Sequence, residues 1–195
     1  VKYYLKLGAK IIWMPTLHAR NQIEYFGRDP FANHPGIRLL DENGDLKPEV
    51  LEILDLIKEY DATVATGHIS IGESIAVCNA ARERGVRTVL THPDWTCTTV
   101  PADVQTQLVK KGVILEKLWF DIGINHVTAE YMAQTIRDAG VENCFMATDR
   151  GQSGKEYPVE GLMMFMDAML DCGFSVEEIH IMTHENPERV LGLRP

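Results

Sequence analysis

The sequence predicts an α/β fold in which short parallel strands alternate with helices. Short apolar runs recur along the chain, each run leads into a polar loop, and a helical pattern follows each loop. Five such βα units follow one another without a linker, which fits either a doubly wound sheet or a barrel. No glycine-rich GxGxxG loop follows the first strand, and polar residues end three separate strands. These features favour the (β/α)8 TIM-barrel type, here as a partial barrel of five units.

Apolar runs and helical periodicity place the elements in order. Strands are expected at residues 9–14, 63–69, 87–92, 113–118 and 143–148. Helices are expected at residues 48–60, 72–84, 101–111, 128–139, 158–172 and 186–193. Ser175 with Glu178 three residues later forms a capping box that starts one more helix. The segment 16–48 lacks sustained periodicity and is expected to be a long loop that contains a small hairpin at 37–45.

The first residues of the chain have the pattern of the end of a helix. Residues 1–7 are helical in character, and Gly8 follows as the residue that ends the helix. A chain that begins with Val1 within a helix is expected to be a fragment, with barrel strands one to three upstream. The alternative is a complete protein that starts with a short helix.

Composition limits the classes of function. A hydrophobic fraction of 45% and a charged fraction of 24% over 195 residues are globular values. The net charge is −9 and no Lys/Arg cluster interleaves with aromatic residues, so no nucleic-acid partner is expected. No apolar run reaches about 18 residues, so no membrane span is expected. The four cysteines are widely spaced and form no CxxC pair, which predicts free thiols in a reducing cytoplasm.

Three strand ends carry groups that bind metals or move protons. The expected strands lead into His68, His92 and Asp149. Because parallel strands that alternate with helices collect their carboxyl ends on one face, these three side chains are expected to converge. Two imidazoles and a carboxylate suit a divalent metal, or a base with two orienting partners.

In this order, the three residues resemble the second half of an amidohydrolase-type metal-dependent hydrolase. Such enzymes have a His at the end of strand five, a His at strand six and an Asp at strand eight. The tail at 185–193 is similar to their NPA-x-LLGL-like tail, and segments 13–16 and 66–68 together resemble an uncharacterised bacterial amidohydrolase-like family. The resemblance covers residues 8–193. It lacks the family's strand-one His-x-His pair and a clear strand-four lysine.

This resemblance implies that residues 1–195 form a single metal-dependent hydrolase-like barrel domain. It implies a divalent metal, with zinc as the first expectation, and metal-activated water that attacks an amide, ester, lactone or phosphoester of a small-molecule substrate. His68 and His92 would ligate the metal, and Asp149 would ligate it and act as the catalytic proton acceptor. A site role is also weighed for Glu116 and His18, and a substrate-binding role for Arg150, His126 and Trp95.

Each of these residues also has a structural interpretation. His68 and His92 would then be satisfied core histidines, Glu116 a surface residue, and the loop residues simply solvated. Asp149 would be an N-cap, although a polar loop separates it from the next helix. The rival functions are a non-catalytic or degenerate barrel that binds a small molecule or a partner chain, and a phosphoesterase of the polymerase-and-histidinol-phosphatase type. Homo-oligomerisation stays open.

Overall fold

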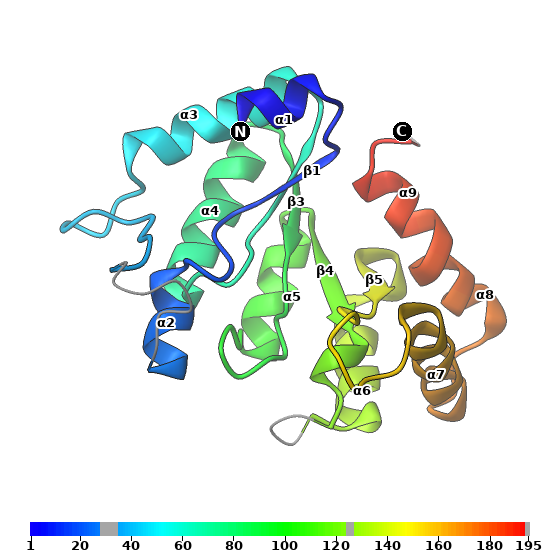
Figure 1. The fold of residues 1–195 in the computed structure, drawn as a ribbon. Coiled ribbons are helices and arrows are strands. Elements are labelled where there is room, and N and C mark those ends of the chain that lie inside the picture. Colours follow the sequence, from blue (N-terminus) through cyan, green and yellow to red (C-terminus); the bar gives the residue numbers. More distant parts are fainter. Residues whose placement is uncertain (28–34, 124–126, 194–195) are drawn as a thin grey trace.

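The computed structural model describes residues 1–27, 35–123 and 127–193 and has a five-stranded parallel sheet at its centre (Figure 1). The strands are β1 (Ile11–Trp13), β2 (Thr63–Ala65), β3 (Arg87–Leu90), β4 (Val113–Leu118) and β5 (Cys144–Ala147). Each strand pairs with the next in the sequence, so the sheet order is β1-β2-β3-β4-β5. A doubly wound sheet reverses its strand order at a switch point, whereas a barrel wall does not. The expected partial barrel of five βα units is confirmed.

Nine α-helices lie within the described residues, and most of them follow the strands. They are α1 (Lys2–Lys6), α2 (Arg20–Phe26), α3 (Pro48–Glu59), α4 (Ile71–Glu83), α5 (Ala102–Lys110), α6 (Ala129–Ala139), α7 (Pro158–Asp171), α8 (Val176–His180) and α9 (Asn186–Val190). Two 3₁₀ turns, η1 (Trp119–Asp121) and η2 (Val141–Asn143), flank α6, and a π-helical turn, η3 (Ile181–Glu185), joins α8 to α9.

Local sequence signals start several of these helices. The capping box expected at Ser175 is present, since its side chain accepts the backbone N–H of Glu178. A second capping box opens α4, where Ser70 accepts the N–H of Glu73 and the Glu73 carboxylate accepts the N–H of Ser70. Pro48 occupies the first turn of α3, where its missing N–H costs nothing.

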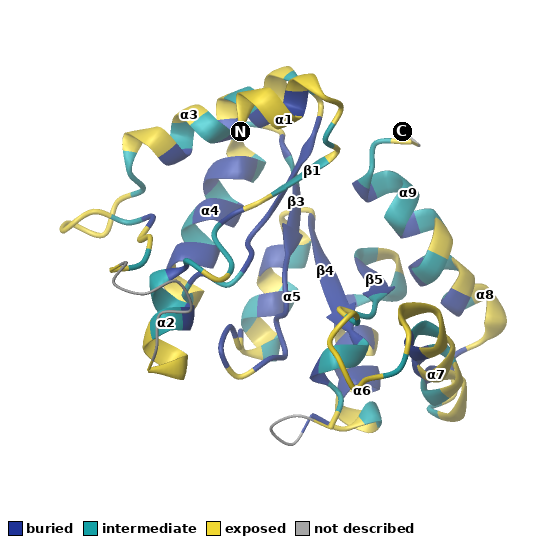
Figure 2. Cartoon of the chain, viewed as in Figure 1, coloured by how far each residue is buried: buried dark blue, intermediate teal, exposed yellow. Residues whose placement is uncertain are grey.

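The two faces of the sheet bury different sets of residues, because side chains alternate along a strand. One face packs on α3 to α7 and supplies the larger clusters, with β-strand residues Val64, Leu90, Leu115, Cys144 and Met146. The inner face carries a smaller apolar cluster, closed by Val190 of α9, with Ala65, Val89, Ile114 and Phe145. Figure 2 shows the strands as mostly buried, while α1 and the outer side of α7 are exposed.

The segment 16–48 differs from its expected loop structure. It contains the helix α2, and the expected hairpin is reduced to one antiparallel bridge between Leu40 and Leu46. No side-chain cap starts α2, so the sequence offers no local signal for this helix. Tertiary contacts stabilise it instead, including the hydrogen bond from the Arg20 N–H to the Ile37 carbonyl at 3.0 Å.

No described helix is long and apolar enough to span a membrane. All four cysteines lie in the described ranges and are free thiols. Cys78, Cys97 and Cys144 are buried, and burial raises the pKa of Cys78 and Cys144 to about 12. These buried thiols are packing residues.

Candidate functional site

A cavity of about 360 Å³ lies at the carboxyl ends of the strands. Four of the residues expected at the site line it, namely His68, His92, Glu116 and Asp149. The rest of its wall is mostly apolar and comes from the ends of β1, β4 and β5: Trp13, Leu17, Leu118 and Ala147. The barrel topology thus brings His68 and Asp149 to one cavity although they lie 81 positions apart in the chain (149 − 68).

The backbone at these strand ends is held in an uncommon conformation. His92 and Asp149 have φ values of 49° and 47°, in the left-handed region that side chains with a Cβ disfavour. Gly67, just before His68, has a φ of 62°, and a Cβ there would lie 2.4 Å from the carbonyl oxygen of Met14. Such conformations cost about 1–3 kcal/mol each and cluster at functional sites, where surrounding structure enforces them.

His92 is held between two carboxylates. Its Nδ1 lies 3.0 Å from Oδ1 of Asp121, which is fully buried, and its Nε2 lies 3.4 Å from Oδ2 of Asp149. Thr98 fixes the backbone by donating its hydroxyl to the His92 carbonyl at 2.6 Å. Burial alone lowers the pKa of His92, but the bonds to Asp121 and Asp149 outweigh burial and raise this pKa to about 9.

His68 is held by neutral groups only. Its Nδ1 is hydrogen-bonded to Oε1 of Gln22, on α2. The Pro15 carbonyl accepts its backbone N–H at 3.0 Å, and Asn21 Nδ2 donates to its carbonyl at 3.1 Å. Burial, reinforced by the nearby charge of His92, lowers the pKa of His68 to about 4. His68 is therefore neutral near pH 7, with an unprotonated ring nitrogen.

Glu116 lies on the inner face of β4, below the two imidazoles, with 8% of its surface exposed. Burial raises the pKa of its carboxyl to about 7, and the nearby charge of His92 limits this rise. The expectation of a surface residue does not hold for Glu116, because alternation along β4 turns its side chain toward the inner face.

A buried ion pair between Lys117 of β4 and Asp94 holds the turn that follows His92. Lys117 Nζ donates to Asp94 Oδ2 at 2.7 Å, and to Gln105 Oε1 and Thr135 Oγ1 at 2.9 Å each. All three ammonium protons are thus used, and both ions are fully buried as side chains. The network ties the turn after His92 to β4, α5 and α6.

The remaining candidates lie in different places. His18 lines a neighbouring cavity rather than this one. Trp95 is buried against both imidazoles, with ring centroids 5.1 Å from His68 and 5.2 Å from His92. Arg150 is bonded through Nε to Glu156 at 2.5 Å and lies over the ring of Phe120. His126 lies outside the described residues.

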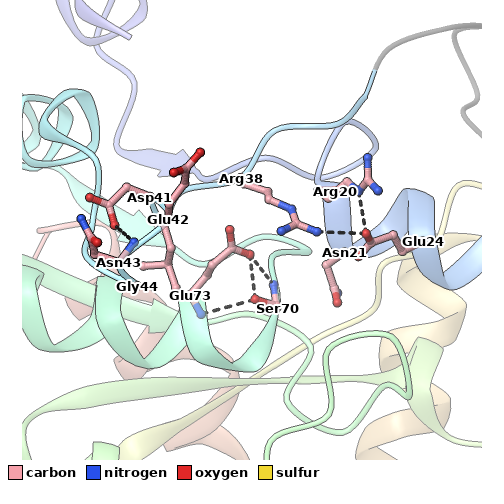
Figure 3. A pocket seen from close by; sticks show the side chains of 11 residues that line it. Arg20, Asn21, Glu24, Arg38, Asp41, Glu42, Asn43, Gly44, Ser70 and Glu73 are labelled. Carbon is pink, nitrogen blue, oxygen red and sulfur yellow. Dashed lines mark hydrogen bonds and ion pairs between the residues drawn. The ribbon is translucent and has the colours of Figure 1, made fainter.

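A larger cavity, of about 560 Å³, lies beside the other face of α2 (Figure 3). It is open and polar, and it holds no imidazole. Several of its charged groups already have partners: Glu24 accepts from Arg20 and Arg38, and Glu73 completes the cap of α4. The smaller cavity is the candidate site because strained strand ends and shifted pKa values gather there.

The donors at the smaller cavity fit a divalent metal in chemical type. Both imidazoles have Nδ1 engaged, and a carboxylate behind an imidazole, as Asp121 stands behind His92, commonly orients a metal-bound histidine. The distances between these donors do not form a complete metal site. Within residues 1–27, 35–123 and 127–193, no three His, Cys, Asp or Glu side chains form a group that could hold a metal. Asp149 pairs directly with His92 instead.

Sequence reasoning missed four residues that shape this site. Gln22 and Asn21 were hidden in a segment without periodicity. Asp121 follows β4 as His92 follows β3, so the same strand-end pattern would have found it. Lys117 stands in an apolar strand, and a lysine there signals a buried partner, which is Asp94.

The family of unknown function DUF6282 matches residues 1–116. The chain belongs to this family. Its matched part holds β1 to β3 and most of β4, and thus His68, His92 and Glu116, while Asp149 lies beyond it. None of the curated proteins matches the chain.

Solved structures resemble the chain over most of its length. An amidohydrolase from Pseudomonas aeruginosa has a TM-score of 0.68 at 14% identity, covering 97% of this chain and 66% of its own. A phosphotriesterase homology protein from Escherichia coli, with phosphate in its active site, has a TM-score of 0.60 at 17% identity, covering 82% and 61%. A protein from Agrobacterium tumefaciens has a TM-score of 0.52 at 15% identity, covering 73% and 55%.

The chain therefore spans less than two thirds of these proteins. At such identities the likeness concerns the fold. The resemblance to amidohydrolase-type proteins, expected from the order of the strand-end residues, is confirmed at that level.

Proposed function

We propose that this chain carries the site of a metal-dependent hydrolase of the amidohydrolase type. The observation that supports this most is the gathering of His68, His92 and Asp149, from three strand ends, at one cavity. The names of the structural neighbours, an amidohydrolase and a phosphotriesterase homology protein, agree with a hydrolase. The substrate would be a small molecule with an amide, ester, lactone or phosphoester bond.

His68 and His92 would hold the metal, each through Nε2, since Nδ1 of each is engaged elsewhere. His92 would exchange the contact of its Nε2 with Asp149 for the metal and give up the proton on that nitrogen. A divalent ion such as Zn²⁺ supplies Lewis acidity and makes water nucleophilic near pH 7. Asp149 would accept the proton of the attacking water and deliver it to the leaving group. Its side chain is 46% exposed, so substrate and solvent can reach it. Asp121 would keep the His92 ring oriented throughout.

A non-catalytic binding role is the alternative. The lack of a three-ligand metal group among the described residues favours it. A metal measurement on the purified chain separates the two proposals, because a degenerate barrel has no reason to take up zinc.

The test is equilibrium dialysis against Zn²⁺ followed by elemental analysis. We expect about one or two ions per chain, and a clear loss of occupancy in His68→Ala and in His92→Ala. His180→Ala serves as the matched control, since His180 is 57% exposed and pairs with Glu185 near the end of the chain. Equal zinc content in all four proteins would show that neither imidazole is a ligand.

A further inference from the structure

The segment after β1, together with the first turn of α2, contacts His68 at its backbone N–H, its backbone carbonyl and its ring. The carbonyl of Pro15 accepts the backbone N–H of His68, and Nδ2 of Asn21 donates to its backbone carbonyl. Gln22 then reaches the ring itself, with Oε1 on Nδ1. Backbone and ring of His68 are therefore fixed by residues that precede it by about fifty positions.

Helix α2 is fixed by contacts that do not involve His68. Asn21 Nδ2 also donates to the Cys97 carbonyl at 2.7 Å, and the Tyr25 hydroxyl lies 2.5 Å from Oγ1 of Thr96. The rings of Tyr25 and Phe26 each pack 6.1 Å from Trp95. A seven-residue helix is marginal by itself, so these contacts make it a rigid support.

We propose that Gln22 is a positioning residue that selects the tautomer of His68, with the proton on Nδ1 and the lone pair on Nε2. An amide oxygen accepts hydrogen bonds and donates none, so Oε1 is satisfied only when Nδ1 carries the hydrogen. Gln22 is 8% exposed, so water competes little for this bond. The consequence for metal binding rests on the proposed function, while the tautomer itself does not.

This assignment contrasts with the one alternative that the contact allows. If the Gln22 amide were turned around, its NH₂ group would donate to Nδ1, and the ring hydrogen would stand on Nε2. His68 would then present a donor to the cavity and would be unable to ligate a metal without moving. The two arrangements differ in a quantity that can be measured directly.

The experiment is a long-range ¹H–¹⁵N spectrum of the ¹⁵N-labelled, metal-free chain at pH 8, with the His68 signals assigned through His68→Gln. We expect a protonated Nδ1 and a bare Nε2 in the wild type. Gln22→Met keeps the length of the side chain and removes the acceptor, so the spectrum should shift toward the Nε2–H form. Gln22→Glu still offers an oxygen and should restore the Nδ1–H signal.

The matched control is Glu24→Gln, on the opposite side of the same helix. Glu24 accepts from Arg20 and Arg38 at the larger cavity and makes no bond to His68, so the His68 spectrum should not change (Figure 3). An Nε2–H signal in the wild type, or a Gln22→Met spectrum equal to the wild type, would overturn the proposal. A melting curve of each variant shows whether α2 is retained.

Zinc affinity gives a second measurement. Residues behind a ligating histidine typically change metal affinity by about 10–100-fold when they are replaced, so Gln22→Met should weaken Zn²⁺ binding within that range. Gln22→Glu should recover most of it. If the wild type binds no zinc, the proposed hydrolase site fails, and the tautomer measurement still decides the role of Gln22.

Discussion

The two imidazoles of the site lie about 5 Å apart, with ring centroids 5.3 Å from each other, yet different chemistry holds them. His92 is bonded to the buried carboxylate of Asp121, and the turn that follows it holds Asp94 of the buried Lys117–Asp94 ion pair. His68 rests on neutral groups from the segment after β1. Their pKa values move in opposite directions, to about 9 and about 4. Burial lowers the pKa of both imidazoles, and only at His92 do neighbouring carboxylates outweigh it, so the partners decide which imidazole is protonated.

The largest expected effect comes from Asp149, whose carboxylate faces His92, the protonated imidazole of the two. Asp149→Asn keeps the shape and removes the charge that faces His92. A lost general base typically lowers a rate about 10²–10⁴-fold. The test measures kcat on any substrate that the wild type hydrolyses, together with a melting curve. Activity near the wild-type value would remove Asp149 from the mechanism.

The ion pair below His92 should give the largest change in stability. Lys117→Met leaves Asp94 buried without its partner, which typically costs about 3–5 kcal/mol of unfolding free energy. Urea unfolding measures this change. Lys111→Met is the control, because Lys111 pairs with Asn79 at an exposed position, and its effect should stay within about 0.5 kcal/mol. Equal effects of the two substitutions would contradict the structural role of the network.

The free energy of unfolding should depend on pH through both imidazoles, falling at high pH because of His92 and at low pH because of His68. The raised pKa of His92 contributes stability that is complete below 6.5 and is lost as pH rises through about 9. The lowered pKa of His68 contributes stability that is complete above 6.5 and is lost as pH falls through about 4. At 1.36 kcal/mol per unit, a shift of roughly 2.5 units makes each effect about 3 kcal/mol.

Unfolding free energies measured from pH 4 to pH 10 would reveal both losses of stability. The loss at high pH, due to His92, is the basic limb of the curve, and the loss at low pH, due to His68, is its acidic limb. Asp121→Asn should flatten the basic limb, and His68→Gln should flatten the acidic limb. The buried thiols of Cys78 and Cys144 also titrate at high pH, but they are present in every variant and cancel in the difference. If one substitution changed both limbs equally, the two losses of stability could not be assigned to separate imidazoles, and the contrast between His92 and His68 would be wrong.

The smallest expected effect concerns the tight turn before His68. Gly67→Ala places a Cβ 2.4 Å from the carbonyl oxygen of Met14 at a φ of 62°. Gly27→Ala is a close control, since Gly27 has a φ of 64° and nothing within 4 Å of the added Cβ. The difference in unfolding free energy between the two variants isolates the backbone contact, and should be about 1 kcal/mol or more. No difference would mean that the turn relaxes freely.

The sequence predicted the sheet well because strand and helix periodicities are local. Each of the five strands lies at or inside its expected range, and the helix starts at Pro48 and Ser175 follow from capping rules. The strands before His68 and His92 end early, at Ala65 and Leu90, because the chain there turns through positive φ. His and Asp adopt positive φ more often than most other residues with a Cβ, but residue type alone does not mark His92 and Asp149 among the other His and Asp residues of the chain.

The candidate site was predictable only in part. Strand ends collect on one face in any barrel, so the convergence of His68, His92 and Asp149 followed from topology. Gln22 was not predictable, because it acts on a residue 46 positions away through a helix that tertiary contacts stabilise. The direction of each pKa shift was equally hidden, since it depends on whether an amide or a carboxylate lies beside the ring.

The π-helical turn η3 determines which side of the last helix, α9, faces the sheet. α8, η3 and α9 form one helical run, and a turn with one extra residue rotates everything after it by about 100°. With that phase, Asn186 faces inward and donates to the carbonyls of Val141 and Cys144 at 2.7 and 2.6 Å. The Val190 carbonyl meets the Thr63 hydroxyl at 2.5 Å. The number of residues in η3 therefore sets both contacts, and a one-residue deletion there would misalign them at once.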